Sequence, residues 1–175
     1  MRPATPLALV LVLMLAGCAL AGCGGKAEPA TPPALSAPYS TVDGEYQQAR
    51  SHLDLPAGTA FPDHLPNTAQ RYVPGSGANQ AQNFWLCAWL REYLAAPPGD
   101  TGRIQRAVNQ LPRYTAMSAY TAGLRPEGRS LVDAAIQGAQ KGDRQPVGTF
   151  VQNTCGGPYY SQAGSGAASP QPSRS

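Results

Sequence analysis

The stretch from residue 79 to residue 95, NQAQNFWLCAWLREYLA, constrains the fold more than any other part of the chain. From Phe84 onward, apolar side chains would cover nearly every side of a helix formed by these residues. A helix that is apolar all round has to be buried. Pro97, Pro98 and Gly99 follow it and would end it. The pattern therefore predicts a central helix that other elements of the fold enclose.

Several shorter stretches have apolar side chains at helical spacing, which predicts further helices. They lie at residues 46–53, 104–111, 112–120, 131–139 and 147–151. Asp43 precedes the first of them and Asp100 or Thr101 the second, each as a candidate N-cap. Gly142 follows the 131–139 stretch as a candidate C-cap. No stretch alternates at strand spacing with comparable strength, so we expect a mainly α fold.

Residues 54–78 and the two ends of the chain lack apolar residues at helical spacing. Prolines and glycines interrupt 54–78 without any clean period, which predicts an irregular segment over the core, with a short two-stranded element as one alternative. Small residues and proline dominate 23–42, a flexible linker, and 161–175, a disordered tail. The sequence thus predicts one domain at 43–160, a small single-domain bundle of five or six short helices.

Two cysteines lie inside this predicted domain. Cys87 falls midway along the central helix, and Cys155 follows the last apolar stripe. A zinc site needs about four ligands, and no CxxC or HxxxH spacing is present. In an exported chain, two such cysteines usually pair. We therefore expect one Cys87–Cys155 disulfide; buried free thiols and thiol chemistry are the alternatives.

The first 23 residues carry an address signal. A run of ten apolar residues from Leu7 to Ala16 follows the positive Arg2, the length of a signal-peptide core and too short to span a bilayer. The tetrapeptide LAGC then occurs twice, ending at Cys18 and at Cys23. Each copy resembles the lipobox of bacterial lipoproteins, in which the cysteine accepts a diacylglycerol and becomes the first residue after cleavage.

This resemblance implies a signal peptide at 1–22 and a lipid anchor on Cys23, with Cys18 as the alternative. Cys23 is favoured because its use removes Cys18 with the signal and leaves no odd thiol in the mature chain. A diacyl anchor gives stable membrane attachment. We therefore expect an extracytoplasmic protein held on the outer face of the cell membrane. An ordinary secretory signal and an uncleaved anchor are the alternatives.

Composition excludes some functions and leaves few candidates for others. A net charge of +3, without a basic run, argues against a nucleic-acid partner. His52 and His64 each have an acid beside them, but no GxSxG motif accompanies them, and a solvated loop position is the favoured interpretation. Glu92 is the first carboxylate to check for hydrolytic chemistry, although a paired surface group is the favoured interpretation. We expect no metal and no cofactor.

The large aromatic residues of the central helix give one further candidate. Trp85, Trp89 and Tyr93 are spaced i, i+4 and i+8, so they could share a face and form a ligand platform, with core packing as the favoured interpretation. The stretch FWLCAWLREYLAA, with the later NTC, also resembles a pattern in uncharacterised exported proteins of high-GC bacteria, which implies no activity.

These features favour a non-enzymatic binding or accessory module of the cell envelope. Its expected partner is an envelope protein or the cell wall. A cell-wall-acting hydrolase is the alternative, since a pair of carboxylates across a cleft would suffice for one. A ligand-binding lipoprotein of an import system ranks below both because the domain is small for a two-lobed architecture.

Overall fold

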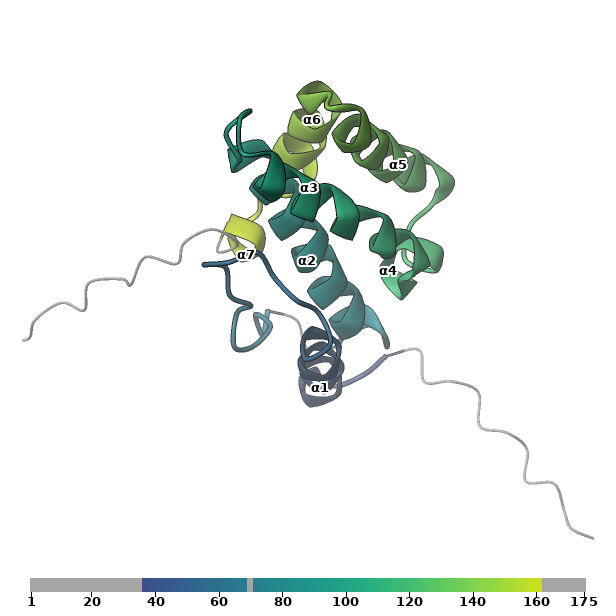
Figure 1. The fold of residues 1–175 in the computed structure, drawn as a ribbon. Coiled ribbons are helices and arrows are strands. Elements are labelled where there is room, and N and C mark those ends of the chain that lie inside the picture. The colour runs from purple at the N-terminus through teal and green to yellow at the C-terminus, as the bar shows by residue number, and fades with distance from the viewer. Residues whose placement is uncertain (1–35, 69–70, 162–175) are drawn as a thin grey trace, which may run out of the picture. The chain divides into compact units, whose positions relative to one another are not determined.

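The computed structural model describes residues 36–68 and 71–161, and this part of the chain is mainly helical, as the sequence predicts (Figure 1). The longer helices are α1 (Tyr39–Arg50), α2 (Ser76–Ala95), α3 (Thr101–Gln110), α5 (Pro126–Lys141) and α6 (Arg144–Thr154). Short turns of helix complete it: η1 (Leu111–Ala116), α4 (Ser118–Thr121) and α7 (Pro158–Ser161). Within the described ranges no β-strand forms; Ala37 and Tyr72 make an isolated antiparallel bridge.

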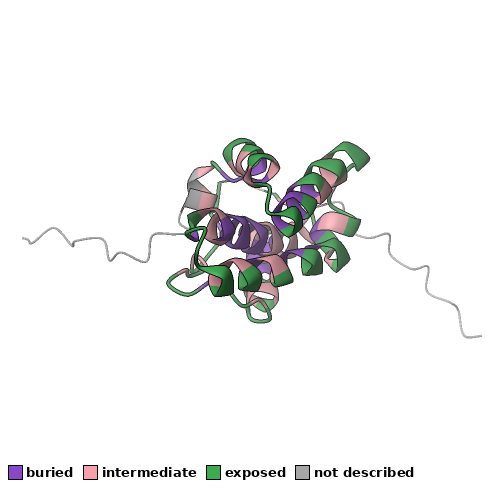
Figure 2. Cartoon of the chain, turned by 45° about the horizontal axis from the view of Figure 1, so that its top comes forward, coloured by how far each residue is buried: buried purple, intermediate pink, exposed green. Residues whose placement is uncertain are grey.

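Helix α2 is the centre of the domain. It packs against α1, α3, η1, α4 and α6. Phe84, Trp85 and Leu90 are fully buried along it, and across the domain the buried residues line the inward sides of the helices (Figure 2). The predicted central helix is therefore confirmed, with its start three residues earlier than the apolar pattern indicates.

Helices α1 and α2 approach each other closely at Gly77. A Cβ atom built on Gly77 would lie 1.9 Å from the carbonyl oxygen of Val42, so only glycine fits there. Glu45 of α1 reaches the same point, and its carboxylate accepts hydrogen bonds from the backbone N–H groups of Gly75 and Gly77. Backbone N–H groups at the start of a helix have no intrahelical partner, and Glu45 supplies one for two such groups at the start of α2.

The start of α1 corrects two expectations. The helix begins at Tyr39 after Pro38, so the predicted linker at 23–42 extends too far toward the domain. Asp43 lies in the middle of α1 and does not cap it. Its carboxylate instead accepts hydrogen bonds from the backbone N–H of Leu65, at 2.9 Å, and from Nδ1 of His64, at 2.8 Å. The side chain that looked like a cap therefore fastens the irregular segment to α1.

Helices α5 and α6 form a tight pair whose ends agree with the sequence. Gly142 adopts φ 76° as the C-cap of α5, as predicted. Asp143 caps α6 by accepting a hydrogen bond from the N–H of Gln145. Gly138 packs against Pro146, since a Cβ at Gly138 would lie 2.4 Å from the proline Cγ. The pair therefore packs by close backbone approach, with no large side chain at this point.

The predicted disulfide is present. Cys87 and Cys155 are bonded with their Cα atoms 5.7 Å apart, and both residues are buried. Beside the disulfide, the Arg91 guanidinium donates hydrogen bonds to the backbone carbonyls of Cys155 and Tyr160. The end of α6 and the following α7 are therefore fixed to the middle of α2.

None of the helices within the described ranges is both long and apolar enough to cross a bilayer. The expected signal peptide, Cys18, Cys23 and residues 162–175 of the tail predicted at 161–175 lie outside the residues that the structure describes, while Ser161 is the last residue of α7.

Candidate functional site

The aromatic residues of α2 pack in the core, the interpretation that the sequence favoured over a ligand platform. Trp85, Trp89 and Tyr93 are 0%, 7% and 1% exposed, so none of them offers a ring face to a ligand. The Nε1 atoms of both tryptophans donate hydrogen bonds to the backbone carbonyl of Asp54, at 2.8 and 3.0 Å. The two indoles therefore belong to the core, where they also hold the irregular segment against α2.

Glu92 is paired. The Arg103 guanidinium donates to both of its carboxylate oxygens, in a bidentate contact between α2 and α3. This ion pair, together with the coulombic attraction of Asp100, raises the pKa of Arg103. Both carboxylate oxygens of Glu92 are therefore committed to this ion pair between the two helices, the paired state that the sequence favoured.

The two histidines lie in different settings. His64 is hydrogen-bonded to Asp43 of α1, and its expected neighbour Asp63 lies beside Arg50 instead, at 4.0 Å. His52 is exposed just after α1. Among the described residues, no Ser, Thr or Cys side chain hydrogen-bonds to either histidine, so no nucleophile–base pair is formed.

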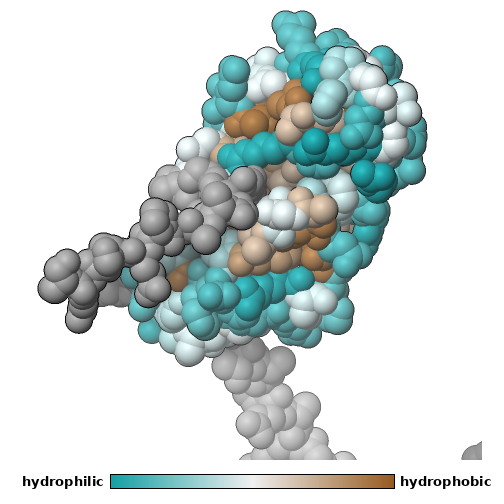
Figure 3. All heavy atoms as spheres, turned by 60° about the vertical axis from the view of Figure 1, so that its left-hand side comes forward, coloured by the Kyte–Doolittle hydropathy of each residue, from teal (hydrophilic) through white to brown (hydrophobic). Residues whose placement is uncertain are grey.

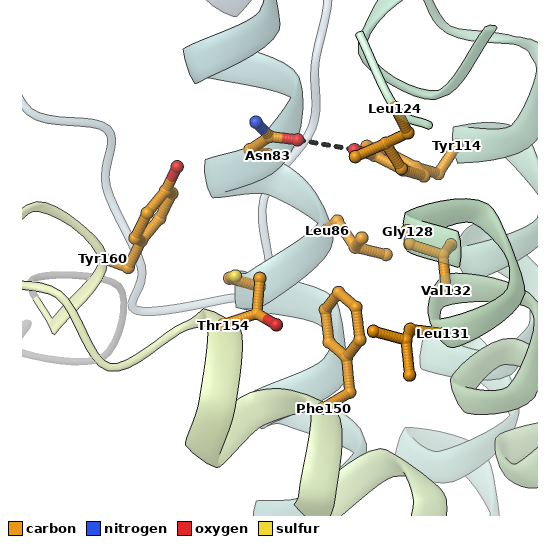
Figure 4. A pocket seen from close by; sticks show the side chains of 11 residues that line it. Asn83, Leu86, Tyr114, Leu124, Gly128, Leu131, Val132, Phe150, Thr154 and Tyr160 are labelled. Atoms are coloured by element: carbon orange, nitrogen blue, oxygen red, sulfur yellow. Dashed lines mark hydrogen bonds between the residues drawn. The ribbon is translucent and has the colours of Figure 1, made fainter. Parts of the chain in front are cut away.

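The candidate site that remains is an apolar pocket between α2, α5 and α6, which we call the α2–α5–α6 pocket (Figure 4). Its volume is about 140 Å³. It is lined by Asn83, Leu86, Cys87, Tyr114, Leu124, Gly128, Leu131, Val132, Phe150, Thr154 and Tyr160. Figure 4 shows Leu86, Leu131 and Phe150 pointing toward one another, with Tyr114 and Leu124 at the opposite end. Helices far apart in the sequence thus supply its walls.

The polar atoms at the edge of this pocket are bonded within the protein. The Tyr114 hydroxyl donates to Oδ1 of Asn83, and the Tyr160 hydroxyl donates to Oε1 of Gln80 at 2.9 Å. Burial raises the pKa of both tyrosines, so both phenols are neutral near neutral pH. The lining contains no Asp, Glu, His, Lys or Arg. The pocket can therefore bind an apolar group, and its lining carries no charged side chain.

Leu131 lies at the mouth of the pocket. It is 61% exposed, and Val73, at 68%, is the other large apolar residue that is mostly exposed among the described residues. A second, shallower hollow begins on the other side of Leu131 and shares Phe150 and Thr154 with the pocket. On the face that Figure 3 shows, hydrophobic side chains gather in two patches with hydrophilic ones between them. Leu131 therefore separates two apolar hollows.

Sequence reasoning missed this pocket for a physical reason. Leu86, Val132 and Phe150 have the helical spacing of ordinary core residues, and the space between them depends on how the helices pack. The exposed Leu131 was predicted as part of a buried stripe; that prediction is wrong because Val132, Ala135, Ile136 and Ala139 form the buried face. Leu131 lies at one edge of that stripe, and this position was the one sign of the pocket in the sequence.

No protein-family model matches this chain, and comparisons with curated proteins and with solved structures gave no significant match. In the part of the chain that the structure describes, no group of three or more His, Cys, Asp or Glu side chains is arranged to hold a metal ion. The features that bear on function are therefore the α2–α5–α6 pocket and the two LAGC copies near the N-terminus.

Proposed function

We propose that the protein is a lipid-anchored, extracytoplasmic binding module of the cell envelope, without catalytic activity of its own. The observation that carries the proposal is the α2–α5–α6 pocket, an apolar hollow whose lining has no charged side chain. Pockets of this kind, apolar with few polar groups, are the usual form of a binding site. Its partner would be an envelope protein or cell-wall component that presents an apolar group.

The chemistry of the described residues favours binding over cell-wall hydrolysis. A glycosidase needs two carboxyl groups facing each other across a cleft, one of them with a raised pKa. Glu92, the strongest candidate, is held by Arg103, and Asp43 has a pKa that is lowered. These two carboxyl groups are therefore committed to contacts within the protein, which supports a binding role through the apolar pocket over hydrolysis.

The membrane anchor rests on the two LAGC copies and on the proline-rich stretch after them. Changing Cys23→Ser should release the protein from the membrane fraction, because the thiol accepts the lipid. Cys18→Ser is the matched control and should leave it there. The intact mass should correspond to the chain from Cys23 plus a diacylglyceryl group. A lipid-free protein, or one released by Cys18→Ser alone, would contradict use of Cys23.

The binding role is tested in cells with a photo-crosslinking phenylalanine derivative at position 131, at the mouth of the pocket. Gln140 is the control position, since it is exposed about two and a half turns further along the same helix, on the side opposite Leu131. We expect a discrete crosslinked product from position 131, none from position 140, and loss of the product when Gly128→Leu fills the pocket. Equal labelling from both positions would count against the proposal.

A further inference from the structure

We infer that the α2–α5–α6 pocket binds a single neutral ring, and that the apolar group that the partner presents to it is a monocyclic aromatic group. This inference rests on the proposed binding role and adds the class of ligand. It is carried by three properties of the pocket: its size, the absence of charge in its lining, and the position of its aromatic walls.

The size of the pocket matches one ring. Its volume is about 140 Å³. An apolar cavity of about 150 Å³ lined by leucine, isoleucine and phenylalanine stays dry and binds benzene. Leu86, Val132 and Phe150 give this pocket a lining of the same kind. A fused two-ring molecule or a long acyl chain would extend beyond it into solvent.

The lining admits a neutral group and disfavours a charged one. An ion that leaves water needs an opposite charge or several hydrogen bonds to replace its hydration. The lining supplies no charged side chain, and the Tyr114 hydroxyl is already committed to Asn83. An aromatic carboxylate should therefore bind much more weakly than the neutral ring of the same size.

Each end of the pocket combines an aromatic ring with aliphatic side chains, Phe150 beside Leu131 at one end and Tyr114 beside Leu124 at the other (Figure 4). Phe150 of α6 and Tyr114 of η1 both contribute ring surface, and aromatic rings gain from tilted and edge-to-face contacts with one another. Leu131 is 61% exposed at the mouth, so a bound ring would cover apolar surface that is otherwise in contact with water. The ligand-free protein therefore leaves an apolar surface for an aromatic ring to cover.

The test uses the purified full chain with its disulfide intact, labelled on the methyl groups of leucine and valine for NMR. Toluene is the neutral ring, benzoate the charged ring, and decanol the long chain. We expect toluene to cause saturable shifts at Leu86 and Val132, and benzoate to cause none at the same concentration. Equal binding of benzoate and toluene would overturn the inference.

Two variants show whether the shifts report on this pocket. Gly128→Leu adds a side chain toward Leu124, where a Cβ would lie 3.3 Å from its Cδ2, and should fill the space. Gly148→Leu adds the same side chain on α6 at a position with nothing within 4 Å. We expect Gly128→Leu to weaken toluene binding by about tenfold or more and Gly148→Leu to leave it unchanged. An equal effect of both would overturn the inference.

The decanol arm separates the inference from the proposed function. Saturable decanol shifts at Leu86 and Val132 without toluene shifts would overturn the ring inference and leave the binding role standing. No saturable shift with any of the three probes would overturn the inference; the crosslinking experiment at position 131 would then decide the binding role by itself.

Discussion

At the scale of single residues, Gly77 has the strictest requirement. The backbone of α1 leaves no room for a side chain there, because a Cβ would meet the Val42 carbonyl oxygen. Gly44, on α1 itself, has open space around its Cα. Two glycines within helices therefore serve different purposes, and only one of them is needed for packing.

We expect Gly77→Ala to destabilise the domain by about 2 kcal/mol or more, since the two helices would have to separate. Gly44→Ala is the matched control and should stabilise it by about 0.5–1 kcal/mol, the usual gain from removing glycine inside a helix. Chemical denaturation of both variants measures the two effects. A neutral result for Gly77→Ala would mean that α1 and α2 are further apart than described.

The carboxyl group of Asp43 makes the stability of the fold depend on pH. Burial opposes its charged form, but the hydrogen bonds from His64 and from the Leu65 N–H outweigh that effect and hold the pKa of Asp43 below 3.8. A carboxyl group whose pKa is lowered in the folded state stabilises the fold above its unfolded pKa. That contribution is lost as the pH falls through the folded pKa.

The difference in unfolding free energy between the wild type and Asp43→Asn should therefore be constant above about pH 5 and shrink toward about pH 2. Asp63→Asn is the control, because the Asp63 side chain is 97% exposed, and it should show little difference at any pH. Urea denaturation across this range provides the measurement. A difference that grows toward low pH would show that Asp43 is destabilising as a carboxylate.

At the scale of the elements, the sequence was informative wherever local chemistry decides the outcome. Asp100 caps α3 by accepting a hydrogen bond from the Arg103 N–H, and Gly142 ends α5, both as predicted. Asp43 failed as a predicted cap because its partner, the segment at residues 64–65, is distant in sequence. The pocket was missed for the same reason, since packing between distant helices leaves no local pattern.

The disulfide links two of these elements across a sequence separation of 68 residues. Closing a loop of that length stabilises a fold by about 4 kcal/mol in the chain-entropy account. The double variant Cys87→Ala, Cys155→Ala should lose about that much stability, measured by denaturation under non-reducing conditions. A loss below about 1 kcal/mol would mean that the packing of α6 on α2 and the Arg91 contacts suffice by themselves.

At the scale of the whole molecule, one buried helix organises the described domain. Every longer helix except α5 makes a substantial contact with α2, and α5 is held mainly through its partner α6. The α2–α5–α6 pocket lies beside α5, where the indirect attachment of this helix to α2 leaves space. Binding there should therefore depend on the α5–α6 pair as a unit and respond little to changes in α1.

The Cys87–Cys155 bond also determines what happens when a protease cuts the chain between the two cysteines. The chain between the two cysteines includes exposed turns, at residues 97–100 and 121–123. A cut in either turn would produce two polypeptides that remain one covalent molecule, each holding its place against α2. Such a cleaved protein would run as a single band on a non-reducing gel and as two bands after a reductant is added. The pocket would remain formed although the backbone is cut.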